Sequence, residues 1–145
     1  MKQWFTLLAL ASTIFISSSM AQAACKHEGA CSQSCTLGPH FISPKDGDTV
    51  SSEILVKMGI KGMKVHKAGD LIEGTGHHHL IIDGANVPEN EVVPADEKHI
   101  HFGKGQTETI INLKPGKHTL TLQFADGHHQ SYGKIMSRTI NITVK

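Results

Sequence analysis

The sequence predicts an all-β fold, a single immunoglobulin-like antiparallel β-sandwich, with a small β-barrel as the runner-up. Two observations lead to this prediction. About seven short apolar runs follow one another at roughly ten-residue spacing, with turn residues between them. In addition, no stretch of the chain after the N-terminal region has the period of an amphipathic helix. Short strands without helices are typical of sandwiches and barrels.

The individual strands are recognised by side chains that alternate between apolar and polar. The clearest case follows His118, where leucine and phenylalanine alternate with threonine and glutamine. Pro-Gly and Asp-Gly pairs close several of the runs, as expected of turns. In chain order, the expected strands span residues 41–48 with their turn, 50–60 with a continuation at 63–65, 77–83, 99–102, 107–113, 118–124 and 137–144.

Residues 1–23 are typical of a signal peptide for export. Lys2 is followed by an apolar run over residues 4–16, a serine patch and the small-residue cleavage site Ala21-Gln22-Ala23. The apolar run is too short for a stable membrane span. We therefore expect a periplasmic or secreted protein, with a lipoprotein anchored through Cys25 as the alternative.

Residues 24–38 are expected to form an N-terminal arm, which carries all three cysteines, before a sandwich domain at residues 39–145. One interpretation is a local disulfide, Cys31 to Cys35 or Cys25 to Cys31, as favoured by an oxidising compartment. The other is a secondary thiol site for Cu(I) or zinc. That site would use Cys25, His27, Cys31 and Cys35.

Histidine is the outlier of the composition, with 11 residues against a single tyrosine. Neutral imidazole is a good ligand for copper and zinc, and it is also the natural pH switch in mildly acidic conditions. Basic and acidic residues are balanced, 14 to 13, so the chain lacks the positive charge expected of a nucleic-acid-binding protein. The sequence has no nucleophile elbow, zinc-protease helix or phosphate-binding loop.

Histidine pairs two residues apart predict a metal site. Residues i and i+2 of a strand share a face, so His77 with His79, and His99 with His101, are expected to form two clamps of two nitrogens each. His128, in the loop before the last strand, is the fifth expected ligand. An all-imidazole site of this kind suits copper first and zinc second.

Three further histidines are additional candidates: His78, His118 and His129. His78 follows the alternation of Leu80, but both faces of that run are apolar, so the period leaves its direction open. His118 is in phase with the apolar side chains of its own strand. It is therefore expected to be a buried, hydrogen-bonded histidine, a ligand, or a residue that orients a ligand.

The same segments resemble a family of exported bacterial proteins known only as a domain of unknown function. The resemblance lies in the motifs GHHHLIID at residues 76–83, IHFGKGQTE at residues 100–108 and PGKHTL at residues 115–120, and in Asp126 followed by His128. It covers about Pro39 to Val144 and implies that these segments form one domain, without implying an activity. The histidines that match its motif positions are His77, His78, His79, His101, His118 and His128.

These features predict a periplasmic protein that binds copper or zinc for metal buffering, delivery or resistance. Two other classes stay open at this point. One is a non-catalytic, pH-sensitive interaction module whose histidines bind a periplasmic protein or another ligand. The other is a copper-dependent oxidoreductase. The expected partner is the metal ion itself, and neither nucleic acid nor a stable membrane span is expected.

Overall fold

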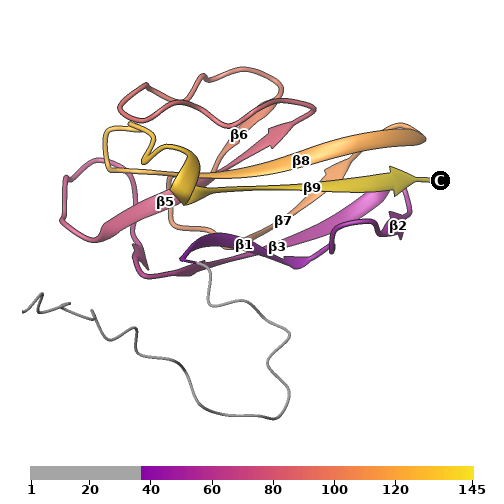
Figure 1. Ribbon diagram of the computed structural model, residues 1–145, viewed down its shortest axis with the longest axis horizontal. Coiled ribbons are helices and arrows are strands. Elements are labelled where there is room, and N and C mark those ends of the chain that lie inside the picture. Colours follow the sequence, from indigo (N-terminus) through magenta and orange to yellow (C-terminus); the bar gives the residue numbers. More distant parts are fainter. Residues whose placement is uncertain (1–36) are drawn as a thin grey trace, which may run out of the picture. The chain divides into compact units, whose positions relative to one another are not determined.

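Two β-sheets face each other in the computed structural model, which describes residues 37–145 (Figure 1). The smaller sheet has the strand order β1 (Gly38–Ser43), β3 (Glu53–Lys61) and β7 (Glu108–Asn112). The predicted all-β sandwich is therefore confirmed, with two separate sheets in place of one closed barrel. The larger sheet has the order β2 (Thr49–Val50), β9 (Ser137–Val144), β8 (Gly116–Ala125), β5 (Thr75–Ile82) and β4 (Lys64–Val65), and β6 (His99–His101) also pairs with β5.

The long strand pairs are antiparallel, as predicted, but two short pairs are parallel. Strand β2 pairs with β9, and β4 pairs with β5, over two residues each. Neither pair is joined by a tight hairpin, so no turn imposes the antiparallel direction. The single helical element of residues 37–145 is the one-turn 3-10 helix η1 (Lys134–Met136). Within this range no helix has the length and apolar character needed to cross a membrane.

The main core fills the space between the two sheets and follows the period of two along each strand. From the larger sheet it takes Leu80 of β5 and Leu120 and Leu122 of β8, all fully buried. From the smaller sheet it takes Val56 and Met58 of β3. Alternating positions of these strands point inward because successive side chains leave opposite faces of a sheet.

A second, smaller cluster lies on the outer face of the larger sheet. It consists of Ile81, Val87, Val93 and Ala125, because the connection from β5 to β6 folds back over that face (Figure 1). Gln123 holds this connection, since its side-chain oxygen accepts a hydrogen bond of 3.2 Å from the Val87 backbone N–H. Strand β5 is therefore covered on both faces, which explains its apolar residues on both sides.

The residues before 37 lie outside the described part of the chain. They include the predicted signal peptide, most of the predicted N-terminal arm and the predicted thiol site at Cys25, His27, Cys31 and Cys35.

Candidate metal centre

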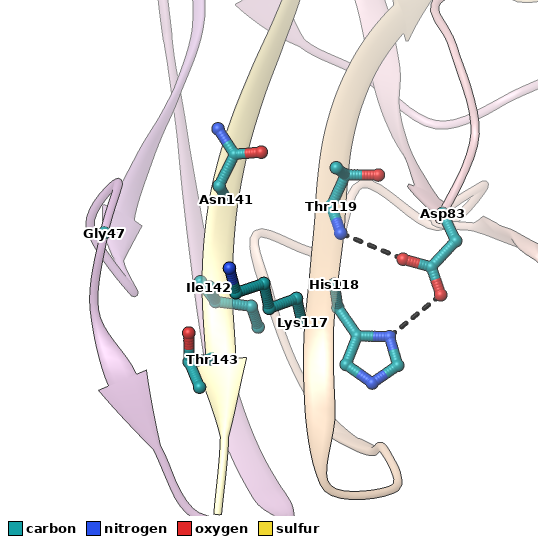
Figure 2. Close-up of a pocket in the computed structure, with 8 residues that line it drawn as sticks. All are labelled: Gly47, Asp83, Lys117, His118, Thr119, Asn141, Ile142 and Thr143. Carbon is teal, nitrogen blue, oxygen red and sulfur yellow. Dashed lines mark hydrogen bonds and ion pairs between the residues drawn. The ribbon is translucent and has the colours of Figure 1, made fainter.

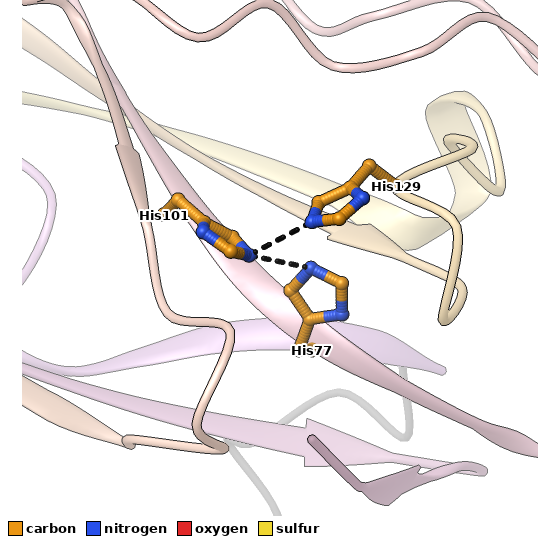
Figure 3. Close-up of side chains that lie close together, drawn as sticks. All are labelled: His77, His101 and His129. Atoms are coloured by element: carbon orange, nitrogen blue, oxygen red, sulfur yellow. Dashed lines mark hydrogen bonds between the residues drawn. The ribbon is translucent and has the colours of Figure 1, made fainter. Parts of the chain in front are cut away.

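Three imidazole rings from distant parts of the chain converge on the outer face of the larger sheet. His77 comes from β5, His101 from the end of β6, and His129 from the turn that follows β8 (Figure 3). The Nε2 atom of His101 lies 3.2 Å from Nε2 of His77 and 3.1 Å from Nε2 of His129. One nitrogen from each ring lies within 4.8 Å of the other two, which is close enough for a shared metal ion.

The register between β5 and β6 brings His77 and His101 together. His79 lies directly opposite His101 in this antiparallel pair, and His77 is two residues away on the same face of β5. The ring centres of His77 and His101 are 5.0 Å apart. The predicted sharing of one face by His77 and His79 is confirmed, since their ring centres are 4.7 Å apart.

His79 lies beside the three converging nitrogens but contributes none of them. Together, His77, His79, His101 and His129 form what we call the histidine cluster. Its ring stacks against that of His101, with the ring centres 5.1 Å apart and the planes inclined by 26°. Its side chain is 2% exposed. None of its nitrogens belongs to the group of ligand atoms within 4.8 Å of one another. In this structure His79 therefore packs against the ring of His101 and does not act as one of the converging donors.

The turn after β8 is fixed in a shape that projects His129 over the sheet. Asp126 Oδ1 accepts hydrogen bonds from the backbone N–H groups of His128, at 2.8 Å, and Gln130, at 2.9 Å. His129 has a φ of 67°, in the left-handed region that histidine enters more readily than most residues. Its carbonyl accepts a hydrogen bond of 3.0 Å from the N–H of Val93, which ties the turn to the covering loop.

Gly103 makes room for the ring of His101. A Cβ atom at this position would overlap Cε1 and Nε2 of that ring. Any side chain at residue 103 must therefore displace the imidazole from its place beside His77 and His129. The glycine is required here for close packing against the ring.

Burial keeps the rings of His77 and His79 neutral at pH 7. The pKa of His77 is lowered to about 4 and that of His79 to about 2, chiefly by removal from water and to a lesser extent by the charges of neighbouring histidines. Burial also lowers the pKa of His101. The charge of Asp126 raises the pKa of His77, but burial outweighs it. Neutral imidazoles carry the free lone pairs that a metal ion requires.

Two of the three nitrogen–nitrogen distances fit a transition metal ion. In a tetrahedral site with metal–nitrogen bonds of about 2.0–2.1 Å, neighbouring nitrogens lie about 3.3 Å apart. The two short distances, 3.1 and 3.2 Å, are close to that value. His101 Nε2 has either one hydrogen or one lone pair, so it cannot form two well-directed hydrogen bonds with the two neighbouring neutral rings at once. A cation between the rings would be bound by one lone pair from each of them.

One feature departs from the usual surroundings of a ligand histidine. The Nδ1 atom of His77 is buried and has no hydrogen-bond partner among the described residues. Histidines that bind metals usually donate this hydrogen to a carbonyl or a carboxylate. The packing of β5 therefore orients His77 without such a partner.

Two of the five predicted ligands lie outside the cluster. The Nδ1 atom of His99 pairs with Oδ1 of Asp96 at 2.7 Å. The side chain of His128 is exposed, and its neighbour His129 takes the place in the cluster. The structure thus brings His77, His79 and His101 together, while the assignment of ligands stays a prediction.

His78 points into the core between the sheets, opposite to His77 and His79. Its ring packs edge-on against Phe124 with the centres 5.1 Å apart, and the side chain is fully buried. Neither ring nitrogen has a hydrogen-bond partner among the described residues. Burial lowers the pKa of His78 to about 4. His78 is therefore a neutral core residue whose buried, unpaired nitrogens cost folding free energy.

His118 is tied into an ion pair at the other end of β8. Its Nδ1 lies 2.8 Å from Asp83 Oδ2, and its Nε2 lies 2.9 Å from the carbonyl oxygen of Lys114. Both partners are acceptors, so both nitrogens must carry hydrogen and the ring is an imidazolium. Asp83 and then the Lys114 carbonyl raise the pKa of His118 accordingly. The ring has no free lone pair for a metal ion.

A pocket of about 410 Å³ opens beside this pair (Figure 2). Because a strand rises about 3.3 Å per residue, the part of β8 between His118 and Ala125 separates the pocket from the histidine cluster by about 20 Å. Ala125 lies opposite His77 in the sheet. The pocket is therefore a separate feature, lined by Gly47, Asp83, Lys117, His118, Thr119, Asn141, Ile142 and Thr143.

Comparison with known proteins identifies a family. A family model described as a domain of unknown function, DUF4399, matches residues 56–145, which include all three converging histidines. No curated protein and no solved structure gives a significant match. The chain therefore belongs to the family of the domain of unknown function DUF4399.

Proposed function

We propose that this protein binds one copper or zinc ion through His77, His101 and His129, and serves metal buffering, delivery or resistance in the periplasm. The observation that carries the proposal is the approach of His101 Nε2 to the Nε2 atoms of the other two rings, at 3.2 and 3.1 Å. The proposed location depends on the signal-like residues 1–23.

The type of ligand supports copper first and zinc second. The group that converges is made of imidazoles alone, with no carboxylate or thiolate among its members in residues 37–145. Magnesium and calcium prefer oxygen ligands, whereas imidazole suits copper and zinc, and copper(II) is bound more tightly than zinc at comparable sites.

The position of the site supports a role in carrying the ion over a role in holding the fold. His77 and His101 lie on the outer face of the larger sheet, whereas the main core lies between the two sheets. His77 is fully buried, whereas His101 is exposed, so one side of the site is open to solvent. An ion in such a site can exchange with its surroundings.

A pH-sensitive interaction module finds less support. Burial lowers the pKa of His77 to about 4 and that of His79 to about 2. Both rings therefore stay neutral between pH 5 and 7, which is the range in which such a switch operates.

Metal titration of the purified mature protein tests the proposal. Competition with a coloured chelator gives the affinity for Cu(II) and Zn(II), and native mass spectrometry gives the number of ions per chain. We expect one ion per chain, bound more tightly than micromolar, with copper tighter than zinc. Failure to find such a site for either metal would overturn the proposal.

A further inference from the structure

We infer that a metal ion held by His77, His101 and His129 keeps a fourth coordination position that is open to a small exchangeable ligand from solvent. The inference rests on the proposed function and specifies what that site does with its ion. Zinc sites that only stabilise a fold are closed by four protein ligands, whereas catalytic zinc sites keep a position free for water or substrate.

The protein supplies three nitrogen donors to the site. Among His, Cys, Asp and Glu of residues 37–145, the converging group contains only the three imidazoles. The nearest further imidazole is that of His79, with its ring centre 4.7 Å from that of His77. Its ring lies nearly parallel to that of His101, inclined by 26°, so it packs against this ligand and does not converge with the others.

Asp126 does not belong to the converging group, and one oxygen of its carboxylate is engaged elsewhere. Asp126 influences His77 through its charge. Its Oδ1 accepts the backbone N–H groups of His128 and Gln130, and these two bonds shape the turn that carries His129. Coordination by this oxygen would remove hydrogen bonds that place a ligand. Asp126 is therefore a positioning residue for His129.

One side of the site is accessible to solvent. His77 forms a fully buried floor, His129 is half-buried and His101 is exposed. An ion among the three nitrogens would thus be shielded on the side of the sheet and reachable from the side of His101. A ligand that completes the coordination would come from that side, as water or as a small solute.

The charge of the bound ion favours an anion as its fourth ligand. Three neutral imidazoles leave the double positive charge of the ion uncompensated, and the ion is the largest local charge in such a site. An anion with a single donor atom is therefore favoured over a neutral molecule as the fourth ligand. Azide, a small anion that binds metal ions through one nitrogen, is a suitable probe.

Azide titration of the protein loaded with one equivalent of Cu(II) tests the inference. We expect a new azide-to-copper charge-transfer band that saturates at one azide per copper, with a matching change in the electron paramagnetic resonance spectrum. Copper bound at one per chain without any spectral response to azide would overturn the inference, while the proposed function would stand. A protein that binds neither Cu(II) nor Zn(II) would instead contradict the proposed function, and the inference with it.

A matched pair of variants distinguishes an open position from one filled by His79. His79→Phe keeps an aromatic ring against His101 and removes both nitrogens, so copper affinity should stay within about threefold and the azide band should persist. His77→Phe removes a ligand and should lower affinity by about 100-fold or more, because even a residue that only orients a ligand contributes roughly 10–100-fold. Equal losses in the two variants would show that His79 is a ligand and would overturn the inference. Thermal unfolding of both variants checks that each is folded.

Discussion

The Nε2 atoms of His101 and His129 lie 3.1 Å apart, although one residue ends the short strand β6 and the other lies in a turn beyond β8. The end of β6 and the turn after β8 meet at this contact. The hydrogen bond from Val93 N–H to the His129 carbonyl, at 3.0 Å, holds the turn against the loop that precedes β6. Together with His77 on the sheet below, the contact completes the three-nitrogen group.

Replacement of His129 should abolish tight metal binding, whereas replacement of its neighbour should not. His129→Ala removes one of three converging nitrogens and should lower the affinity for Cu(II) by about 100-fold or more, since even residues that only orient ligands contribute roughly 10–100-fold. His128→Ala removes an exposed ring and should leave the affinity unchanged. Chelator competition measures both. A larger loss of Cu(II) affinity in His128→Ala than in His129→Ala would show that the turn adopts another shape in solution.

A methyl group at Gly103 should weaken metal binding without touching a ligand. In Gly103→Ala the added Cβ overlaps the ring of His101 and must displace it, so the affinity should fall by at least about tenfold, as for other residues that orient ligands. Gly59→Ala is the matched control, because its Cβ would press on the ring of His40, which lies outside the cluster. Similar affinities in the two alanine variants would mean that His101 is free to move.

Removal of the buried histidine in the core should stabilise the protein. His78→Leu replaces a fully buried ring with two unpaired nitrogens by an apolar side chain of similar size. Leaving a buried polar group without a partner costs about 1–3 kcal/mol, so the free energy of unfolding should rise by an amount of this order. Urea unfolding with a chelator present measures the change. A destabilised variant would show that the nitrogens of His78 have partners in solution.

Acid should destabilise the metal-free protein before its carboxylates titrate. The folded-state pKa values of His77 and His78 are about 4, below the ordinary value of 6.5, so the unfolded chain binds more protons between these limits. Stability is therefore complete above pH 6.5 and falls as the pH drops towards 4. Two such groups together amount to several kcal/mol, because one pKa unit corresponds to about 1.4 kcal/mol.

The ion pair of His118 acts in the opposite sense, because its pKa is raised. Its contribution is present below pH 6.5 and is lost as the pH rises through the raised value. The pair is partly exposed and its effect is correspondingly small. Urea unfolding at pH 7.5 and pH 5 in the presence of a chelator measures the balance. Equal stability at the two pH values would contradict the burial of neutral histidines.

The fold could be predicted because the strands keep to their period. In β8 the leucines point to the core, while threonine and glutamine point to the outer face, as the alternation requires. In β5 the period of two did not reveal which face is the inner one, because the connection to β6 covers the outer face with Val87 and Val93. A covering loop has no period of its own, so the direction of His78 could not be inferred from the sequence.

The site could be predicted only as far as strand geometry reaches. Alternation places His77 and His79 on one face of β5, and His101 on the facing strand. The choice between His128 and His129 depends on a turn in which Asp126 binds two backbone N–H groups and His129 takes a positive φ. An aspartate two or three residues before a histidine is a usable signal for such a turn, although it does not say which histidine points inward.

X-ray absorption spectroscopy of the copper-loaded protein tests the central claim most directly, because it counts the imidazoles bound to the ion. We expect three imidazole nitrogens and one further light atom in the unmodified protein and in His128→Ala, and fewer imidazoles in His129→Ala. A spectrum that is unchanged in His129→Ala, or one with sulfur ligands in place of the three imidazoles, would contradict it.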